Sequence, residues 1–167
     1  MPPVRVIESP QRVLHLIDVE NLLGGPSFTV EDAASVHSAY MATAPIGHEN
    51  HVIVATSHRA ASSTWFAWPQ SARRLVRSGP NGADYALLEV MATECVHCRF
   101  DHVVIGSGDG IFAFRARRLQ RDGCRVSVVT VRRSLSRYLR IAVPDVRFLD
   151  ASMATVARRP SACATHV

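Results

Sequence analysis

Short apolar runs alternate with polar segments of helical spacing along most of this chain. Apolar runs of strand length occupy residues 13–17, 51–56, 101–106 and 125–131, and weaker ones lie at 72–77 and 146–149. Between them the pattern predicts helices at 29–41, 84–94 and 111–121, a short helix at 135–141, and a short helix or loop at 58–68. Runs that are apolar throughout are typical of strands buried on both faces. The alternation predicts an α/β fold with a mainly parallel central sheet and helices on both sides.

Length and composition favour a single globular domain. The chain has 167 residues, of which 47% are hydrophobic and 20% charged. We expect an N-terminal extension over residues 1–11, one domain over 12–150 and a loosely held basic tail over 151–167. No apolar run approaches the roughly 20 residues that span a bilayer, and the first ten residues lack the apolar core of a secretory signal. We therefore predict a cytoplasmic protein with no membrane partner.

The positive charge is carried by arginine alone. All 19 basic residues are arginine, none is lysine, and the net charge is +5. Guanidinium groups make planar, bidentate contacts to phosphate, so this balance favours an anionic partner without identifying it.

Three aspartates come from distant parts of the sequence to one predicted edge of the sheet. Asp18 and Asp109 directly follow apolar strands, and Asp84 lies in the first turn of a helix that follows another strand. The carboxyl ends of parallel strands are where open α/β sheets bind ligands. Clustered carboxylates repel one another unless a cation sits among them, and hard oxygen ligands select Mg²⁺ or Mn²⁺. Such an ion can activate water against a phosphodiester.

Each aspartate also has a purely structural interpretation. Asp18 could accept backbone N–H bonds in an Asx-turn. Asp84, three residues after Asn81, could complete a capping box, and Asp109 could cap the basic helix that follows it. The agreement of all three positions favours the metal site over these alternatives.

Three short motifs carry the candidate acids: Asp18-Val-Glu-Asn21, Gly82-Ala-Asp84-Tyr-Ala-Leu and Ser107-Gly108-Asp109-Gly-Ile-Phe112. In order and spacing they resemble the motifs of the NYN domain, a family of the PIN-like superfamily of metal-dependent ribonucleases. The resemblance runs from about Val13 to Leu149. It implies a three-layer α/β/α sandwich in which the first and fourth strands are adjacent.

The same resemblance implies roles for individual residues. Asp18 and Asp109 would flank the metal, and Asp84 would be a third ligand. Asn21 would orient Asp18 or a metal-bound water, and Ser107 would support the loop that carries Asp109.

One position departs from the family pattern. The family commonly has a second aspartate two residues after Asp109, where this chain has Ile111. Glu20 or Glu89 could substitute for the missing carboxylate. Glu89 is the poorer candidate, because five residues after Asp84 place it about 140° round an ideal helix. The loss weakens the case for a two-metal site.

Arginines and aromatic residues offer an RNA-binding surface. Arg132 and Arg133 follow the carboxyl end of a strand and so share an edge with the acids, and Arg137 and Arg115 are further candidates for backbone contacts. The arginines near 115–121 could equally form an ordinary solvated face. A separate aromatic cluster could stack on unpaired bases or pack under a loop: Trp65, Phe66 and Trp68.

Cysteines and histidines give weaker signals. Cys95 and Cys98 have zinc-type spacing but no second pair, so we interpret them as reduced packing thiols. None of the eight histidines has ligand spacing, and we assign none a catalytic role.

The function predicted by the sequence is a metal-dependent endoribonuclease. The alternative is an RNA-binding or regulatory module of the same fold that has lost turnover. A nucleotide-binding α/β domain is disfavoured, because the chain has no phosphate-binding glycine motif and no lysine to serve one. The sequence leaves a homodimer open.

Overall fold

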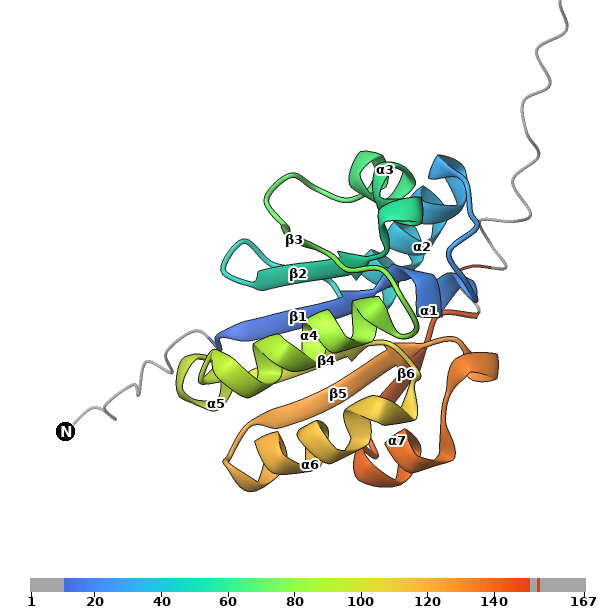
Figure 1. Cartoon of the computed structure of the whole chain (residues 1–167). Helices are drawn as coiled ribbons and strands as arrows, with labels where there is room; N and C mark the ends of the chain where they lie inside the picture. Colours follow the sequence, from blue (N-terminus) through green and yellow to red (C-terminus); the bar gives the residue numbers. More distant parts are fainter. Residues whose placement is uncertain (1–10, 151–152, 154–167) are drawn as a thin grey trace, which may run out of the picture.

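Six parallel strands form the centre of the molecule. A computed structural model describes residues 11–150 and residue 153. The strand order is β3-β2-β1-β4-β5-β6, and every neighbouring pair is parallel (Figure 1). The strands are β1 (Val13–Asp18), β2 (His51–Thr56), β3 (Arg73–Val76), β4 (His102–Gly106), β5 (Arg125–Thr130) and β6 (Val146–Phe148). The predicted α/β fold is confirmed, and the first and fourth strands are adjacent.

Helices cover both faces of the sheet and make a three-layer sandwich (Figure 1). One layer contains α1 (Val19–Leu23), α2 (Val30–Thr43) and α3 (His58–Ala67). The other contains α4 (Gly82–Thr93), α5 (Val96–Arg99), α6 (Ala113–Arg121) and α7 (Arg137–Ala142). Two 3₁₀ turns, η1 (Gly110–Phe112) and η2 (Arg132–Ser134), lead into α6 and α7. Among the residues described, no helix combines the length and apolar character needed to cross a bilayer.

Strand β1 is apolar apart from His15 and the terminal Asp18, because it contributes to two cores. Leu14 and Leu16 pack in the cluster beneath α4 and α6, whereas Ile17 packs in the cluster beneath α2. Side chains of a strand alternate between its faces, so a strand covered on both faces needs apolar residues at successive positions.

The sheet has its topological switch point between β1 and β4. From β1 the chain proceeds to β2 and β3 on one side, and from β4 to β5 and β6 on the other. Ile17 pairs with Gly106, so Asp18 and the loop after β4 leave the sheet side by side. The helices after β1 and β4 lie on opposite faces, which opens a crevice between the two strand ends.

Helix boundaries agree with the pattern in most places and differ in a few. Thr29 caps α2 in a complete capping box with Asp32, and residues 58–67 are helical. The basic segment begins with η1 rather than as one continuous helix. The turn expected after Asp18 is instead the short helix α1, which ends at Gly24 in a left-handed conformation.

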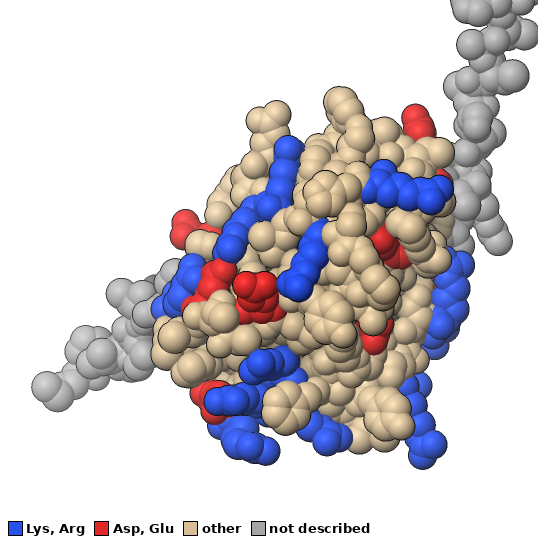
Figure 2. All heavy atoms as spheres, in the orientation of Figure 1, with Lys and Arg blue, Asp and Glu red and all other residues tan. Residues whose placement is uncertain are grey.

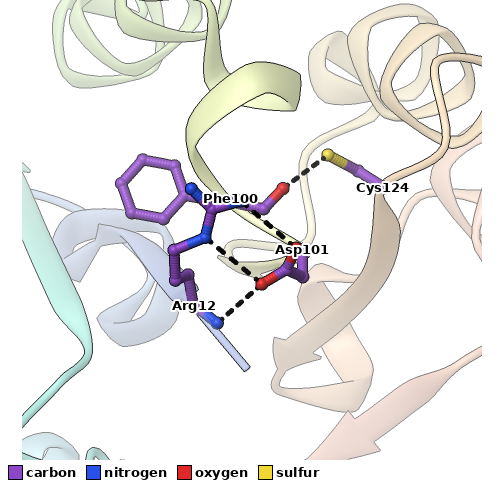
Figure 3. Close-up of polar contacts among 4 residues, drawn as sticks. All are labelled: Arg12, Phe100, Asp101 and Cys124. Atoms are coloured by element: carbon purple, nitrogen blue, oxygen red, sulfur yellow. Dashed lines mark hydrogen bonds and ion pairs between the residues drawn. The ribbon is translucent and has the colours of Figure 1, made fainter. Parts of the chain in front are cut away.

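Polar contacts join the entries of three strands at the opposite edge of the sheet (Figure 3). The backbone N–H of Arg12 donates to Asp101 Oδ2 at 2.8 Å, and the Asp101 N–H donates to the Arg12 carbonyl at 2.9 Å. Just before β5, Cys124 Sγ donates to the carbonyl of Phe100 at 3.1 Å. These contacts hold β1, β4 and β5 in register where the strands begin.

One sequence interpretation changes, and one lies outside the described residues. Cys95 and Cys98 flank and enter α5 as exposed thiols, so the prediction that they pack in the core is wrong, and only Cys124 of the described cysteines is buried. The expected extension (1–11) and tail (151–167) lie outside the described residues apart from Gln11 and Met153.

Leu16→Ala should destabilise the fold strongly, because Leu16 is completely buried in the central strand. Removing such a side chain costs about 2–5 kcal/mol of unfolding free energy. Urea denaturation checks this, with Phe66→Ala as the control at an 80% exposed residue. Equal losses in the two variants would contradict the observed core.

Candidate active site

A hollow of about 340 Å³ opens at the carboxyl edge of the sheet. Its wall comes from the ends of β1, β2 and β3, the start of α4, the loop after β4, and η2. Its polar lining residues are Asp18, Glu20, Asn21, Ser57, Arg77, Asn81, Asp84, Asp109 and Ser134. The structure therefore brings together the three predicted aspartates, with Asn21 and Glu20 beside them.

Asp18 is buried at the end of β1 with only 3% of its surface exposed. Its Oδ1 accepts the backbone N–H of Asn21 at 3.2 Å, so the Asx-type contact is present. Burial raises the pKa of the Asp18 carboxyl, and the negative charge of Glu20 contributes in the same direction. Asp18 therefore makes the Asx-type contact and also has a carboxyl group of raised pKa.

Asp84 enters the hollow from the first turn of α4 and is 5% exposed. Its Oδ1 is buried, and the described part of the chain offers it no hydrogen-bond partner. The capping-box interpretation is wrong, because Asn81 has a left-handed backbone and makes no side-chain capping bond. Burial is the main cause that raises the pKa of the Asp84 carboxyl, and the negative charge of Asp18 raises it further. The two carboxyl groups therefore favour a shared proton or a shared cation.

Asp84 reaches the hollow because the start of α4 packs closely on the backbone at the end of β3. A Cβ placed on Gly82 would lie 2.2 Å from the carbonyl oxygen of Arg77, so only glycine lets α4 begin so near the end of β3. The glycine in the second motif therefore sets the approach of Asp84.

Asp109 is half-buried and caps the turn that follows β4. Its Oδ1 accepts the N–H of Ile111 at 2.9 Å, so the capping interpretation describes one of its contacts. Ser107, which is fully buried, accepts the Asp109 N–H at 3.2 Å. A Cβ on Gly108 would lie 2.3 Å from the Ser134 carbonyl oxygen, so this loop also packs on glycine.

Asn21 and Glu20 tie the loops of the site to one another. Asn21 Oδ1 accepts the N–H of Gly108 at 2.8 Å, which joins α1 to the Asp109 loop. Glu20 Oε1 accepts the Thr56 hydroxyl at 2.9 Å and the Ser57 N–H, which joins α1 to the end of β2. Both residues position the wall of the hollow.

The position of the missing family aspartate faces the core. Ile111 is half-buried and packs against the hydrophobic cluster beneath α4 and α6. Of the two proposed substitutes, Glu20 lines the hollow, whereas Glu89 is exposed and pairs with Arg77 at 3.3 Å. Glu20 is therefore the better placed of the two.

The four arginines predicted to bind RNA lie outside the hollow. Arg133 donates to the Leu23 carbonyl at 3.2 Å, and Arg132 lies over the Phe148 ring at 4.3 Å. Arg137 is exposed at the start of α7, and Arg115 is half-buried in α6. Figure 2 shows arginines gathered on the surface over α6.

Arg77 and Ser134 are among the polar residues of the hollow that the sequence analysis did not assign. Arg77 is the arginine that lines it, and Ser134 donates from its hydroxyl to the Asn21 carbonyl at 3.2 Å. A signal for Arg77 was present, since it ends the third predicted strand and so reaches the same edge as the acids. Ser134 had no signal, because only the packing of η2 on α1 brings it there.

A larger cavity of about 640 Å³ lies near the start of β2 and contains none of the predicted metal ligands. Trp68 lines it and is only 2% exposed, so of the two interpretations of Trp68 packing is confirmed and base stacking is excluded. Trp65 is half-buried, and Phe66 is exposed. The perturbed carboxyls single out the smaller hollow as the candidate active site.

The chemistry of the donors suits a hard divalent cation. Asp18 and Asp84 supply carboxylate oxygens whose charges repel each other, and Asp84 Oδ1 lacks a donor among the described residues. Within residues 11–150 and 153, however, no three His, Cys, Asp or Glu side chains are arranged to hold one ion together. The arrangement thus fits an ion held by the buried pair, with Asp109 lining the same hollow.

The chain belongs to the NYN domain family, whose family model matches residues 12–150. No curated protein matches the chain. Its fold is similar to the crystal structure of a protein of unknown function from Vibrio parahaemolyticus, with 19% sequence identity and a TM-score of 0.57. That match covers 85% of this chain and 94% of the other.

Membership of the family sets the broad class of this protein. The NYN domain has a PIN-like, nuclease-type fold, and its members generally are nucleases that act on RNA. PIN-like nucleases typically use divalent metals.

Asp84→Asn should stabilise the metal-free protein near neutral pH. Because the pKa of both carboxyls is raised on folding, the folded protein binds more protons than the unfolded chain above about pH 4. Wild type should therefore lose stability as the pH rises from there, and the variant should lose less. At about 2–4 °C per kcal/mol, a gain of several degrees in melting temperature is expected in EDTA at about pH 7.5.

The control for this measurement is Asp122→Asn, which changes an exposed aspartate at the end of α6. Its melting temperature should follow that of wild type between about pH 5 and about pH 8. An Asp84→Asn protein less stable than wild type near neutral pH would show that the buried charge is compensated within the fold.

Proposed function

We propose that this protein is a metal-dependent endoribonuclease that hydrolyses RNA phosphodiesters with Mg²⁺ or Mn²⁺. One observation carries the proposal: two buried carboxyls of raised pKa, Asp18 and Asp84, line one hollow with Asp109 at the switch point of an NYN domain. Perturbed carboxyls in a cleft are typical of sites that bind a charged species.

Asp18 and Asp84 would hold the cation, and Asp109 would contribute from the loop after β4. When bound, the ion supplies an activated water and stabilises the leaving oxygen. The protein's own contribution is positional. Asn21 holds the Asp109 loop against α1, and Glu20 holds α1 against the end of β2. A rigid arrangement of this kind keeps the acids in place when an anionic substrate enters.

Arginines outside the hollow would hold the RNA backbone. Arg132 and Arg133 lie on η2, next to Ser134 in the wall of the hollow, and both are exposed. The contact of Arg133 with the Leu23 carbonyl engages one of its five donors and leaves others for phosphate. Arg137 and Arg115 would extend this surface along α7 and α6.

A second candidate function is an RNA-binding module without turnover. Ile111, packed against the core where the family has a carboxylate, is the observation that favours it. A cytoplasmic location and a homodimer stay predictions.

The cleavage assay separates these two functions. With Mn²⁺ or Mg²⁺ at millimolar concentration, wild type should cut a single-stranded RNA, and EDTA should stop the reaction. Asp109→Asn should abolish cleavage, because it removes an anionic ligand at nearly constant shape. Ile111→Asp restores the family pattern and should raise the rate or lower the metal concentration required.

The result that supports the binding module is RNA binding by wild type with no cleavage above the Asp109→Asn level in either metal. Cleavage by Asp109→Asn at the wild-type rate would contradict both functions, since the activity would then come from another site or another protein.

Replacing both Arg132 and Arg133 by alanine should weaken RNA binding and reduce its salt dependence. Each lost phosphate contact lowers the slope of log K against log salt by about 0.7 on single-stranded RNA. Filter binding over a salt series measures this. Arg118→Ala with Arg121→Ala in the last turn of α6 is the control. Equal effects in the two double variants would indicate a diffuse basic face instead of a defined contact.

A further inference from the structure

Tyr85 is an exposed aromatic residue directly beside the candidate catalytic acids. It follows Asp84 in α4, but 46% of its surface is exposed, whereas Asp84 is buried. Successive helical residues lie about 100° apart, so Asp84 enters the hollow, whereas Tyr85 is not among the residues that line it. Nothing in the binding of a cation requires this ring.

Arg77 connects that ring to the hollow. Its guanidinium carbon is 5.9 Å from the centroid of the Tyr85 ring, and Arg77 itself lines the hollow. Arg77 forms an ion pair with Glu89, with 3.3 Å between a guanidinium nitrogen and a carboxylate oxygen. Both side chains are more than half exposed. Exposed pairs of this kind contribute little, so a phosphate can replace the carboxylate of Glu89.

We propose that Arg77 and Tyr85 form a nucleotide subsite at the rim of the active site. Arg77 binds a backbone phosphate next to the acids, and Tyr85 stacks on the base of the adjoining nucleotide. This inference rests on the proposed function and adds a requirement to it. The base must be unpaired and turned out of any helix, so the substrate is single-stranded at this position. A stacked base contributes about 1–3 kcal/mol and tolerates different base identities.

The chain contains a chemically similar pair away from the hollow. Phe114 is 70% exposed, and the guanidinium carbon of Arg115 lies 6.0 Å from its ring centroid. Neither residue lines the hollow. Phe114→Ala therefore controls for the loss of an exposed aromatic ring beside an arginine.

The test measures binding of a labelled single-stranded RNA of about eight nucleotides by fluorescence anisotropy, in an Asp109→Asn background so that the RNA survives. Tyr85→Ala should raise Kd by about 5- to 100-fold, whereas Tyr85→Phe and Phe114→Ala should change it less than about 2-fold. Arg77→Ala should weaken binding and lower the salt slope by about 0.7. Unchanged melting temperatures will show that the variants are folded.

An abasic oligomer of the same length and charge separates stacking from other effects. Tyr85→Ala should leave its Kd unchanged, because it has no bases, while Arg77→Ala should still weaken it. Equal losses on the abasic and the intact RNA, or equal losses in Tyr85→Ala and Phe114→Ala, would overturn the subsite.

Failure of the subsite and failure of the proposed function give different results. If wild type cleaves RNA but Tyr85→Ala binds it like the control, the subsite alone is wrong. If wild type binds RNA without cleaving it, the proposed catalysis is wrong, and the Tyr85→Ala data still decide the subsite. If no protein binds RNA, both proposals fall.

Discussion

Two like charges buried side by side are the constraint on which the site depends. Asp18 and Asp84 each have a raised pKa because they are out of water and because each feels other carboxylates. Such a pair costs stability in the folded chain unless a proton or a cation lies between the groups. Its presence is hard to explain by the needs of the fold alone, because other residues could close the end of β1. The pair therefore supports the proposed cation site.

The loops around this pair are built to stay in place. Asn21 connects α1 to the Asp109 loop, and Glu20 connects α1 to the end of β2. Gly82 and Gly108 sit where a Cβ would meet a backbone carbonyl oxygen at close to 2 Å. The motif residues thus divide their roles: the aspartates present charge, whereas the residues between them determine how closely the loops approach.

The arginines differ in their surroundings, which the net charge of the chain does not show. Arg77 lines the hollow, Arg133 braces the last turn of α1, and Arg132 lies over Phe148. The arginines of α6 form a broad basic area in Figure 2. Only an arginine within reach of the acids could act on a phosphate at the proposed site, so the position of an arginine matters more than the number of arginines.

The fold class and the three aspartates could be predicted from the sequence. Strands buried on both faces are mostly apolar, and the runs at 13–17 and 101–106 follow this pattern apart from His15, Asp101 and His102. A carboxylate placed just after such a run has only one edge of a parallel sheet to occupy. The pattern therefore places Asp18 and Asp109 at the same edge of the sheet, and the family resemblance implied that their strands are neighbours.

What the tertiary structure decided is which side chains surround those acids. The end of β3 and the start of α4 bring Arg77 and Tyr85 to the rim, and η2 brings Ser134 to the wall. It also leaves Cys95 exposed, against the prediction that this thiol packs. Neighbours that are distant along the chain depend on loop paths and helix packing, which are set by the summed contacts of the whole domain. Hydrophobic periodicity shows only the face on which a residue lies. The sequence therefore determined that the acids lie at the carboxyl edge of the sheet, while tertiary packing determined which other side chains line the hollow there.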